Sequence, residues 1–275
     1  MTMRNEKPDT TRQSEGFDQV HTGLTVGQIA VPRRDLRTCT ATDRESEVLA
    51  GNHGPVFDYL PVEDADGHVI GLLSNRAISA ARRDGGDARV VDRMDPLSEA
   101  DLIGAAAPIV TLIGQVRQKP FLVVSGQVII GMVAWSDLQK LPVRAALFSL
   151  VTGFELTMYE AIRRHFEGGD HWTQHVDECR LCIAKKEYRS QQVRGGEVDL
   201  LLCTQFCDKR DILIGSFDFP IGKKKLKKRF RAIERIRNDV AHANNYAMEL
   251  KQAKKLRATV GDLFELRSWI NSFAR

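Results

Sequence analysis

The residues with the clearest chemical potential are in the hexapeptide Arg237-Asn238-Asp239-Val240-Ala241-His242. Its guanidinium offers fixed positive charge to phosphate oxygens. Its imidazole can accept or donate a proton near neutral pH. These are the groups needed to cleave an RNA phosphodiester without a metal ion. The hexapeptide therefore predicts a site in which Arg237 stabilises charge, His242 transfers protons and Asn238 orients the imidazole.

A strongly basic segment immediately precedes and enters the hexapeptide. Residues 223–237 contain nine Lys or Arg residues and one acidic residue. Such a run is often only a solvated surface, but here it extends positive charge away from the hexapeptide. A positive track attracts a phosphate backbone without reading its sequence. The predicted RNA-binding residues are Lys223, Lys224, Lys225, Lys227, Lys228 and Arg231.

Helices must position these groups, because helical periodicity dominates the chain from Val143 onward. Apolar residues recur at three- and four-residue steps between Val143 and Phe166. Further helices are predicted over residues 172–189, 198–214, from 223 through the hexapeptide, and along the C-terminal stretch. An antiparallel bundle is the economical arrangement of these helices.

A helical wheel tests whether one helix can bring the two reactive groups together. At about 100° per residue, Arg237 and His242 lie about 140° apart, while Ile236, Val240 and Ala243 form a core stripe. One helix alone would therefore not close both groups on one phosphate. Two copies of the chain that meet across a two-fold axis could line a shared cleft, so we expect a homodimer.

The Arg-polar-x-x-x-His pattern resembles the signature of the HEPN superfamily of helical nucleases, found in toxins, phage-defence proteins and CRISPR-associated effectors. The resemblance covers residues 143–275, and its specific part is the hexapeptide. It implies a dimeric helical bundle that cleaves RNA without a metal and leaves 2′,3′-cyclic phosphates. By this resemblance Arg237 and His242 are the catalytic pair, and Asn238 is their polar supporter. One subgroup has Tyr two residues after the His and can be adenylylated there; Asn244 holds that position here.

The first half of the chain contains an internal repeat. Residues 59–73 and 120–133 each read as two β-rich runs joined by an Asp-Gly or Ser-Gly turn, a hairpin signal. The turn glycines, Gly67 and Gly126, lie 59 residues apart, and Gly71 and Gly131 lie 60 apart, so the two copies of the repeat have nearly the same spacing. Helix-like stretches precede the two hairpins, over residues 44–50 and 102–116. Two small α/β modules packed on each other are the predicted fold.

This repeat resembles a tandem pair of CBS domains, often called a Bateman module, over residues 23–142. The Gly-hydrophobic-hydrophobic-x-x-x-Asp-Leu ending of the family is matched in the second repeat, from Gly131 to Leu138. In the family the Asp commonly holds the ribose hydroxyls of an adenine nucleotide. The resemblance therefore implies a nucleotide site formed by Asp137, Ser136 and Gly131.

The chain departs from the family pattern at two positions. The Ser or Thr that contacts phosphate is replaced by Ala134, and Ser136 is the hydroxyl that could substitute. In the first repeat, the Asp position holds Ala77, although Ser74 is kept. One nucleotide site is therefore expected rather than two. The alternative is that Asp137 only caps the following helix.

Charge and composition set the remaining limits. The 275 residues are 43% hydrophobic and 28% charged, as in soluble globular proteins. Residues 1–142 hold 15 Lys or Arg against 19 Asp or Glu, whereas residues 143–275 hold 25 against 17. The second half is thus the better candidate for a polyanionic partner. Residues 1–22 read as a disordered tail, and the lack of an apolar signal or membrane-spanning run predicts a cytoplasmic protein.

The chain has five cysteines, an odd number, and no secretory signal, which argues against a disulfide framework. Two pairs, Cys179 with Cys182 and Cys203 with Cys207, have spacings compatible with zinc, and His175 is near. Both pairs lie in helical patterns, where cysteine packs as a small apolar residue. We therefore expect no metal site there and leave zinc as the alternative.

Together these patterns predict a fold class of two parts: an α/β tandem CBS pair, residues 23–142, followed by an all-α HEPN-like bundle, residues 143–275. The predicted function is a metal-independent endoribonuclease whose activity responds to an adenine nucleotide and whose catalysis needs no cofactor. The alternative function is a non-catalytic, nucleotide-sensing adaptor that binds RNA or a protein.

Overall fold

The computed structural model describes residues 19, 22–51, 58–76, 78, 87–196 and 198–273. The predicted N-terminal tail therefore lies almost entirely outside the described residues. The chain divides into two compact units. We call residues 25–108 and 117–137 the α/β unit. The helical unit contains residues 138–273, together with residues 22–24 and 109–116.

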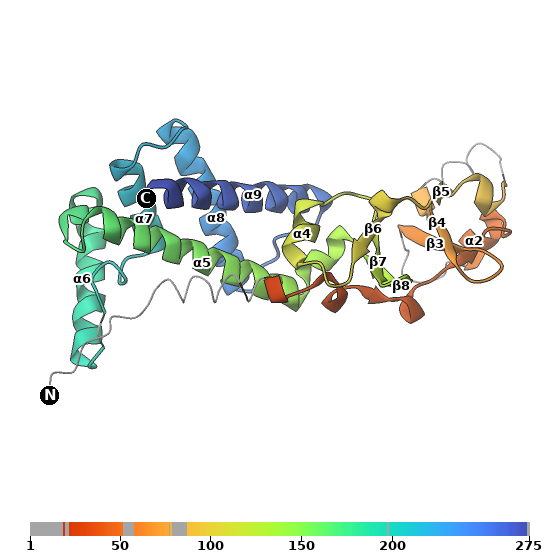
Figure 1. The fold of residues 1–275 in the computed structure, drawn as a ribbon, viewed down its shortest axis with the longest axis horizontal. Helices are drawn as coiled ribbons and strands as arrows, with labels where there is room; N and C mark the ends of the chain where they lie inside the picture. The colour runs from red at the N-terminus through yellow and green to blue at the C-terminus, as the bar shows by residue number, and fades with distance from the viewer. Residues whose placement is uncertain are drawn as a thin grey trace. The chain divides into compact units, whose positions relative to one another are not determined.

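The α/β unit contains two four-stranded sheets of the same plan (Figure 1). In each sheet the two central strands form an antiparallel hairpin. One outer strand runs parallel to the hairpin strand beside it, and the other outer strand runs antiparallel to its own neighbour. The first sheet runs in the order β2 (Cys39–Thr40), β3 (Tyr59–Glu63), β4 (Val69–Ser74) and β5 (Asp95–Pro96). The second runs in the order β1 (Val31–Pro32), β8 (Val128–Val133), β7 (Phe121–Ser125) and β6 (Leu102–Gly104). The predicted repeat of α/β hairpin modules is confirmed.

The two modules exchange their antiparallel edge strands. β1 precedes the first repeat yet pairs with β8, and β5 precedes the second repeat yet pairs with β4. Both pairings place a glycine against the backbone of the edge strand. A Cβ on Gly131 would lie 2.3 Å from the Val31 carbonyl oxygen, and one on Gly71 would lie 2.7 Å from the Asp95 oxygen. This close approach requires glycine at both positions, 60 residues apart.

Short helices complete the modules. The predicted hairpin turns at Gly67 and Gly126 have φ values of 78° and 59°, which glycine adopts without steric cost. The stretch predicted as a helix over residues 102–116 is wrong in its first part, because β6 pairs there with β7. The α/β unit contains α2 (Glu45–Gly51) and the start of the 3₁₀ helix η5 (Trp135–Gln139), whereas α4 (Ile109–Gly114) belongs to the helical unit. Ala77 lies outside the described residues.

The helical unit is a bundle, as predicted. Its helices are α5 (Leu141–His165), α6 (Glu178–Val193), α7 (Phe206–Ser216), α8 (Lys223–Ala241) and α9 (Leu250–Phe273). α5, α8 and α9 pack on one another, and α7 packs against α5 and α8 (Figure 1). The rings of Phe154, Phe206 and Phe230 meet in the core with centroids 5.9 to 6.4 Å apart.

Two helices begin later than the periodicity predicts. The helix predicted from residue 172 starts as the 3₁₀ helix η6 (His171–His175), and α6 begins only after Asp177. The Asp177 carboxylate accepts a hydrogen bond from the Cys179 amide at 3.1 Å, which fixes that start. The helix predicted from residue 198 begins at Phe206, after a capping box formed by Gln205 and Asp208.

α5 is long and apolar enough to cross a membrane by length and composition, with a mean hydropathy of 1.2. The sequence pattern predicted no apolar run of that length. However, 56% of the relevant window is buried inside the unit, and α7, α8 and α9 pack on this helix. The same composition is typical of the central helix of a bundle, and most of the apolar residues of α5 are buried.

Candidate functional site

The hexapeptide forms the end of α8. Arg237 and Asn238 lie in its last turns, and His242 is its C-cap residue. All three side chains are exposed. The His242 amide donates to the Asn238 carbonyl at 3.0 Å, so the bond between this pair joins backbone groups rather than the predicted amide and imidazole.

The helix stops because the chain turns left-handed at Ala243, whose φ is 55°. The Asn244 amide then donates to the Asp239 carbonyl at 2.9 Å, the pattern of a Schellman cap. The predicted core stripe was therefore wrong at Ala243, which is exposed and outside the helix. A non-glycine residue in this conformation is strained by about 1–2 kcal/mol. The strain lies one residue after His242.

Arg144, in the first turn of α5, holds this helix end in place. Its guanidinium donates to the Asp239 carbonyl at 3.0 Å, the Val240 carbonyl at 3.4 Å and the Asn244 carbonyl at 3.0 Å. It also lies 5.2 Å from the centroid of the Tyr246 ring. These bonds satisfy carbonyls that the end of a helix leaves without intrahelical partners. Arg144 therefore joins the residues on both sides of His242.

The loop after His242 is bonded to the end of η5. The Tyr246 hydroxyl donates to the Leu138 carbonyl at 2.7 Å. The Gln139 side-chain oxygen, in the amide orientation that satisfies both partners, accepts from the Tyr246 amide at 3.1 Å and the Ala247 amide at 2.8 Å. Burial raises the pKa of Tyr246 to about 12, so the phenol stays protonated and remains a donor. Leu138 directly follows Asp137.

Arg237 is anchored by a carboxylate on a neighbouring helix. Its Nε lies 3.4 Å from Oε2 of Glu155 on α5. The other oxygen of Glu155 accepts from Lys209 Nζ at 3.2 Å, and Lys209 also donates to the Thr204 carbonyl at 2.7 Å. One carboxylate thus serves two cations, so the group keeps a net positive charge. The Arg237 side chain remains 45% exposed and can reach a ligand.

Sequence reasoning missed Glu155 and Lys209. The available signal was an acid inside an apolar stretch, because Glu155 lies between Phe154 and Met158, both buried. Lys209 is 3% exposed, and a buried ammonium requires a partner. The pair could have been recognised as ionic, but its proximity to Arg237 depends on the packing of α5, α7 and α8.

The exposed face of α8 carries a row of four basic residues that continues into Asn238 and His242, which we call the basic row. Its members follow each other at three- or four-residue steps and are all exposed: Lys224, Lys228, Arg231, Arg235, Asn238 and His242. The row is about 27 Å long at 1.5 Å per residue. Arg235 was not among the residues predicted to bind RNA.

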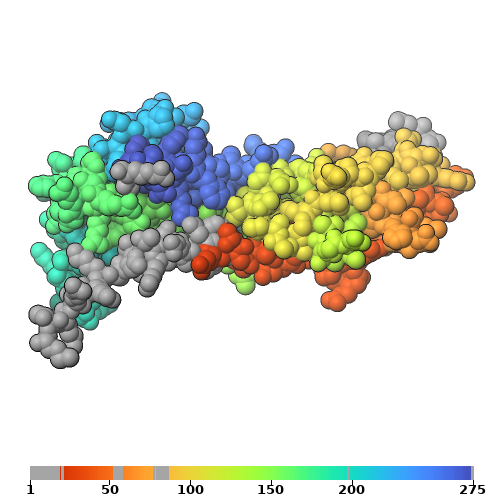
Figure 2. All heavy atoms as spheres, in the orientation of Figure 1, coloured from red at the N-terminus to blue at the C-terminus, as the bar shows by residue number. Residues whose placement is uncertain are grey.

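The other predicted lysines flank this row. Lys223 and Lys225 are exposed in the first turn of α8, whereas Lys227 is half-buried and pairs with Asp211 at 3.4 Å. Figure 2 shows the chain around the start of α8, in light blue, at the surface of the helical unit. Cations oppose the dipole at a helix N-terminus. The lysines therefore do not stabilise this helix end through the helix dipole.

Two of the three predicted nucleotide residues lie at a cavity of about 260 Å³ in the α/β unit. Ser136 and Asp137 line it. Gly131 does not line the cavity; it lets the backbone of β1 lie close to β8. Asp137 Oδ2 also accepts from the Ala134 amide at 2.7 Å, so this carboxylate bonds back to the residue before η5, the helix in which Asp137 itself lies. The other lining residues are Val31, Leu36, Asp58, Tyr59, Gln118, Pro120, Met132, Ala134 and Trp135.

This cavity combines aromatic and acidic groups. Tyr59 and Trp135 supply rings, and Asp58 faces the cavity from the first repeat, which sequence reasoning missed. Among the described residues that line it there is no Lys or Arg. Carboxylates accept hydrogen bonds from a ribose diol or an exocyclic amine, but they repel phosphate. The cavity therefore suits the nucleoside part of a ligand better than its phosphates.

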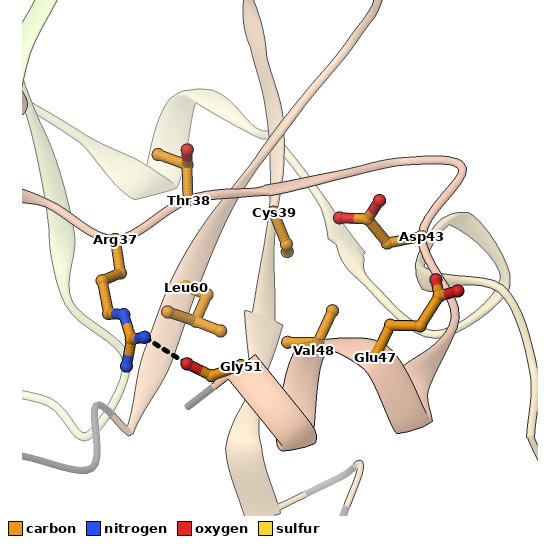
Figure 3. Close-up of a pocket in the computed structure, with 8 residues that line it drawn as sticks. All are labelled: Arg37, Thr38, Cys39, Asp43, Glu47, Val48, Gly51 and Leu60. Atoms are coloured by element: carbon orange, nitrogen blue, oxygen red, sulfur yellow. Dashed lines mark hydrogen bonds between the residues drawn. The ribbon is translucent and has the colours of Figure 1, made fainter. Parts of the chain in front are cut away.

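A larger cavity of about 440 Å³ lies in the first module (Figure 3). It opens between α2 and the segment around β2, and Arg37 donates to the Gly51 carbonyl at its edge. Burial, with Asp43 and Glu63 nearby, raises the pKa of the Cys39 thiol to about 12. A neutral thiol is neither a nucleophile nor a good metal ligand. This cavity contains none of the predicted nucleotide residues.

The four cysteines considered for zinc do not come together in the described residues. Cys179 and Cys182 are exposed on α6, and Cys203 and Cys207 are half-buried. The predicted packing of cysteine among apolar residues is therefore wrong for the first pair. Within the described ranges, the one group of His, Cys, Asp and Glu ligand atoms within 4.8 Å of each other is Asp64, Asp66 and His68. These residues surround an exposed turn.

No family model matches the sequence, and no curated protein matches it. Solved structures similar to this chain include the CBS-pair protein CBSX2 from Arabidopsis thaliana, at 20% identity and a TM-score of 0.37, over 46% of this chain and 95% of that one. CBSX2 in complex with AMP is 21% identical, with a TM-score of 0.36, over 45% and 96% of the two chains. The CBS domain of the bacterial CNNM/CorC family Mg²⁺ transporter in complex with ATP is 16% identical, with a TM-score of 0.37, over 48% and 98%.

Proposed function

We propose that this protein is a metal-independent endoribonuclease of the HEPN type, regulated by an adenine nucleotide bound to a CBS pair. One observation carries the catalytic part. Arg237, Asn238 and His242 are exposed together at the end of a helix whose exposed face is basic, and Glu155 anchors Arg237 without burying it. Toxin action or phage defence is the cellular role that the HEPN resemblance implies.

The proposed reaction is an internal transesterification of RNA. The 2′-hydroxyl loses its proton and attacks the adjacent phosphorus, and the bond to the 5′ oxygen breaks as that oxygen gains a proton. His242 transfers a proton at one of these oxygens. Arg237 stabilises the negative charge that develops on the phosphoryl oxygens. The products are a 2′,3′-cyclic phosphate and a 5′-hydroxyl, and DNA is not cut.

A homodimer would complete the site, and α5 offers a surface for it. Leu141 is 76% exposed and Phe148 is 49% exposed, one heptad apart on the same helix face, with exposed Ala145 between them. Exposed apolar groups in a row are typical of an interface. This face lies on the helix that carries Arg144, which holds the end of α8. Phe148→Glu should therefore shift the protein to monomer and lower cleavage together.

Substitution of the imidazole tests catalysis. His242→Ala should lower the rate of RNA cleavage by about 10²–10⁴-fold, the usual contribution of a proton-transfer group, with little change in thermal unfolding. His171→Ala, at an exposed histidine of η6, is the matched control and should cleave normally. Wild-type activity should persist in EDTA. Full activity of His242→Ala, or loss of wild-type activity in EDTA, would refute the proposal.

The nucleotide is proposed to act through the segment that follows Asp137. Asp137 lines the cavity, and the next two residues, Leu138 and Gln139, are bonded to Tyr246 and Ala247 in the loop after His242. A ligand that binds one arrangement of η5 more tightly than another would thereby bias the position of this loop. The coupling needs no contact between ligand and RNA.

Calorimetry with Asp137→Asn and Asp58→Asn tests the nucleotide site, because an amide oxygen can keep the hydrogen bond from Ala134 while the charge is removed. Adenosine and AMP should bind wild type more tightly than ATP, since the lining has two carboxylates and the described lining residues include no cation. In both variants the affinity for adenosine and AMP should differ less from the affinity for ATP. Equal binding of AMP to wild type and to both variants would show that this cavity is not the nucleotide site.

The non-catalytic adaptor remains the second candidate, and the basic row of α8 favours it equally. It predicts that wild type and His242→Ala bind mixed RNAs with the same affinity and that neither cleaves them. The cleavage assay above therefore separates the two functions.

A further inference from the structure

The helical unit contains a cavity that the proposed reaction has not used. Its volume is about 230 Å³, and it lies between α8, α9 and the loop after His242. We propose that it is a subsite for one nucleobase of the RNA, next to the scissile phosphate, and that guanine fits it best. This proposal rests on the proposed ribonuclease function. Residues of α8 and α9 line the cavity together with Asn245 and Tyr246 of the loop.

The position of the cavity connects it with the reactive groups. Arg235 and Asp239 lie four residues apart on α8, so both face the same side of the helix. Arg235 belongs to the exposed basic row, and Asn245 is three residues beyond His242. A strand of RNA that follows the row to His242 therefore passes the mouth of this cavity.

The interior of the cavity suits a flat aromatic ring. Ile236, Tyr246 and Leu256 are at most 8% exposed and form an apolar floor that includes a phenol ring. Unpaired bases of RNA are commonly held by stacking on aromatic side chains and by hydrogen bonds to their edges. Pockets for drug-sized ligands measure about 300–1,000 Å³. A cavity below that range matches a single base better than a whole nucleotide.

The rim of the cavity supplies the groups that would read the edge of a base. Asp239 presents a carboxylate, whose Oδ1 accepts a hydrogen bond from the side-chain Nδ2 of Asn244 at 3.4 Å. Gln252 uses its oxygen to accept from the Met248 amide at 2.7 Å, which leaves its amide nitrogen as the donor. Arg235 and Lys255 are exposed and can pair with the phosphates on either side.

This chemistry discriminates between bases. A carboxylate accepts two hydrogen bonds side by side, and guanine offers adjacent N–H donors from its ring nitrogen and its amino group. Uracil offers one N–H between two carbonyl oxygens, which the carboxylate repels. Adenine and cytosine each offer an amino donor next to an acceptor, so they should bind with intermediate affinity. Asp239 is therefore the residue that determines base specificity.

Binding of mononucleotides to the His242→Ala protein tests the subsite without requiring cleavage. GMP should bind at least tenfold more tightly than UMP, measured by calorimetry or by shifts of Tyr246 ring resonances. Asp239→Asn should lose most of this preference, because an amide cannot accept two hydrogen bonds in parallel. Gln252→Ala, at an exposed position, should weaken GMP binding without disturbing the fold. Glu178→Gln, an exposed acid on α6, is the matched control and should behave as the parent.

Cleavage of short RNAs distinguishes failure of the subsite from failure of the proposed function. Wild type should prefer RNAs with a guanosine at one fixed position beside the cut, and Asp239→Asn should flatten that preference. Cleavage without base preference, or equal affinity of GMP and UMP for the His242→Ala protein, would overturn the subsite and leave the nuclease intact. Selective GMP binding without cleavage of any RNA would support the subsite and refute the nuclease.

Discussion

Charged residues have different roles in the α/β unit and on the exposed face of α8. In the α/β unit the buried Asp101 carboxylate accepts from Lys119 Nζ at 2.9 Å and Arg117 Nη2 at 3.1 Å, so both cations serve the fold. On α8, Lys224, Lys228 and Arg231 are exposed in a row that ends at His242.

The same contrast occurs within α8. The Arg229 guanidinium pairs with Asp262 at 2.6 Å and with Glu265, both on α9, whereas Arg231, two residues later, is exposed. A cation that is paired with acids on a neighbouring helix contributes to the stability of the fold. Exposed cations at helical spacing add little to stability and are available to a polyanion. Exposed charged residues that pair with no acid therefore indicate function better than charged residues held in ion pairs.

Removal of the central carboxylate of the α/β unit should have the largest effect on stability. Asp101→Asn leaves Lys119 and Arg117 without their shared partner. Breaking a buried pair costs about 3–5 kcal/mol, and we expect about 2–3 kcal/mol because the two cations keep 22% and 30% of their side-chain exposure. Urea unfolding measures the loss. A change below about 0.5 kcal/mol would contradict a structural role for this cluster.

The pH dependence sharpens this prediction. Burial pushes the pKa of Asp101 upward, but hydrogen bonds from Lys119 and Ser98 outweigh it, and the net pKa lies below its ordinary value. A carboxyl with a depressed folded pKa stabilises the protein above its unfolded pKa of about 3.9, and that stabilisation is lost as the pH falls through the folded pKa. The difference in unfolding free energy between wild type and Asp101→Asn should therefore shrink below about pH 4. A constant difference from pH 7 to pH 2 would argue against this linkage.

In the helical unit, Glu155→Gln should affect catalysis more than binding. Arg237 loses its ionic anchor, so we expect kcat to fall about tenfold with little change in KM, because the anchor positions a group that acts in the transition state. Stability should fall by about 1–2 kcal/mol, since Lys209 is buried and keeps only neutral acceptors. Glu160→Gln, whose carboxylate pairs with Arg164 at 3.6 Å on the same helix, is the control and should retain kcat.

Neutralising the exposed row should change RNA affinity and leave stability almost unchanged. The triple variant Lys224→Ala, Lys228→Ala, Arg231→Ala should reduce the slope of log affinity against log salt concentration by about 2, at about 0.7 per contact with a single strand. The matched triple variant on α6, Lys185→Ala, Lys186→Ala, Arg189→Ala, removes the same charge from exposed positions. Equal slopes for the two triple variants would show that net charge, rather than the row, attracts RNA.

The smallest expected effect concerns the strained turn after His242. Ala243→Gly should stabilise the protein by about 0.5–1 kcal/mol, because glycine adopts a φ of 55° without the steric penalty of a Cβ. Ala258→Gly, at an exposed position inside α9, should instead destabilise it by about 1 kcal/mol. Thermal unfolding compares the two. Opposite signs are required, and destabilisation by both would show that the turn is not strained.

Several elements could be predicted from sequence because their signals are local. The hairpins at Gly67 and Gly126 were visible as turn signals between β-rich runs, and α5 and α8 were visible as periodic apolar residues. Predictions failed where a tertiary partner overrode the local pattern. Residues 102–104 carry no mark that separates a strand from a helix start, and they are a strand because β7 lies beside them.

The candidate sites divide in the same way. Residue types and spacing were enough to single out Arg237, Asn238 and His242, since chemistry depends on which groups are present. Ser136 and Asp137 at the cavity of about 260 Å³ could be predicted, but Asp58 and Tyr59, at the start of β3, line the same cavity from more than seventy residues earlier in the chain. Their contribution could not be read from local spacing.

The amino-acid sequence by itself determined where the chain turns, which stretches are amphipathic and which side chains can move a proton or attract phosphate, because these properties belong to neighbouring residues. Only the tertiary structure decided which distant groups meet. Glu155 and Lys209 come to Arg237 through the packing of α5 and α7 against α8, and Arg144 and Tyr246 fix the loop after His242 through contacts across about a hundred residues of chain. Such contacts follow from how whole elements bury their apolar faces, which no local pattern specifies.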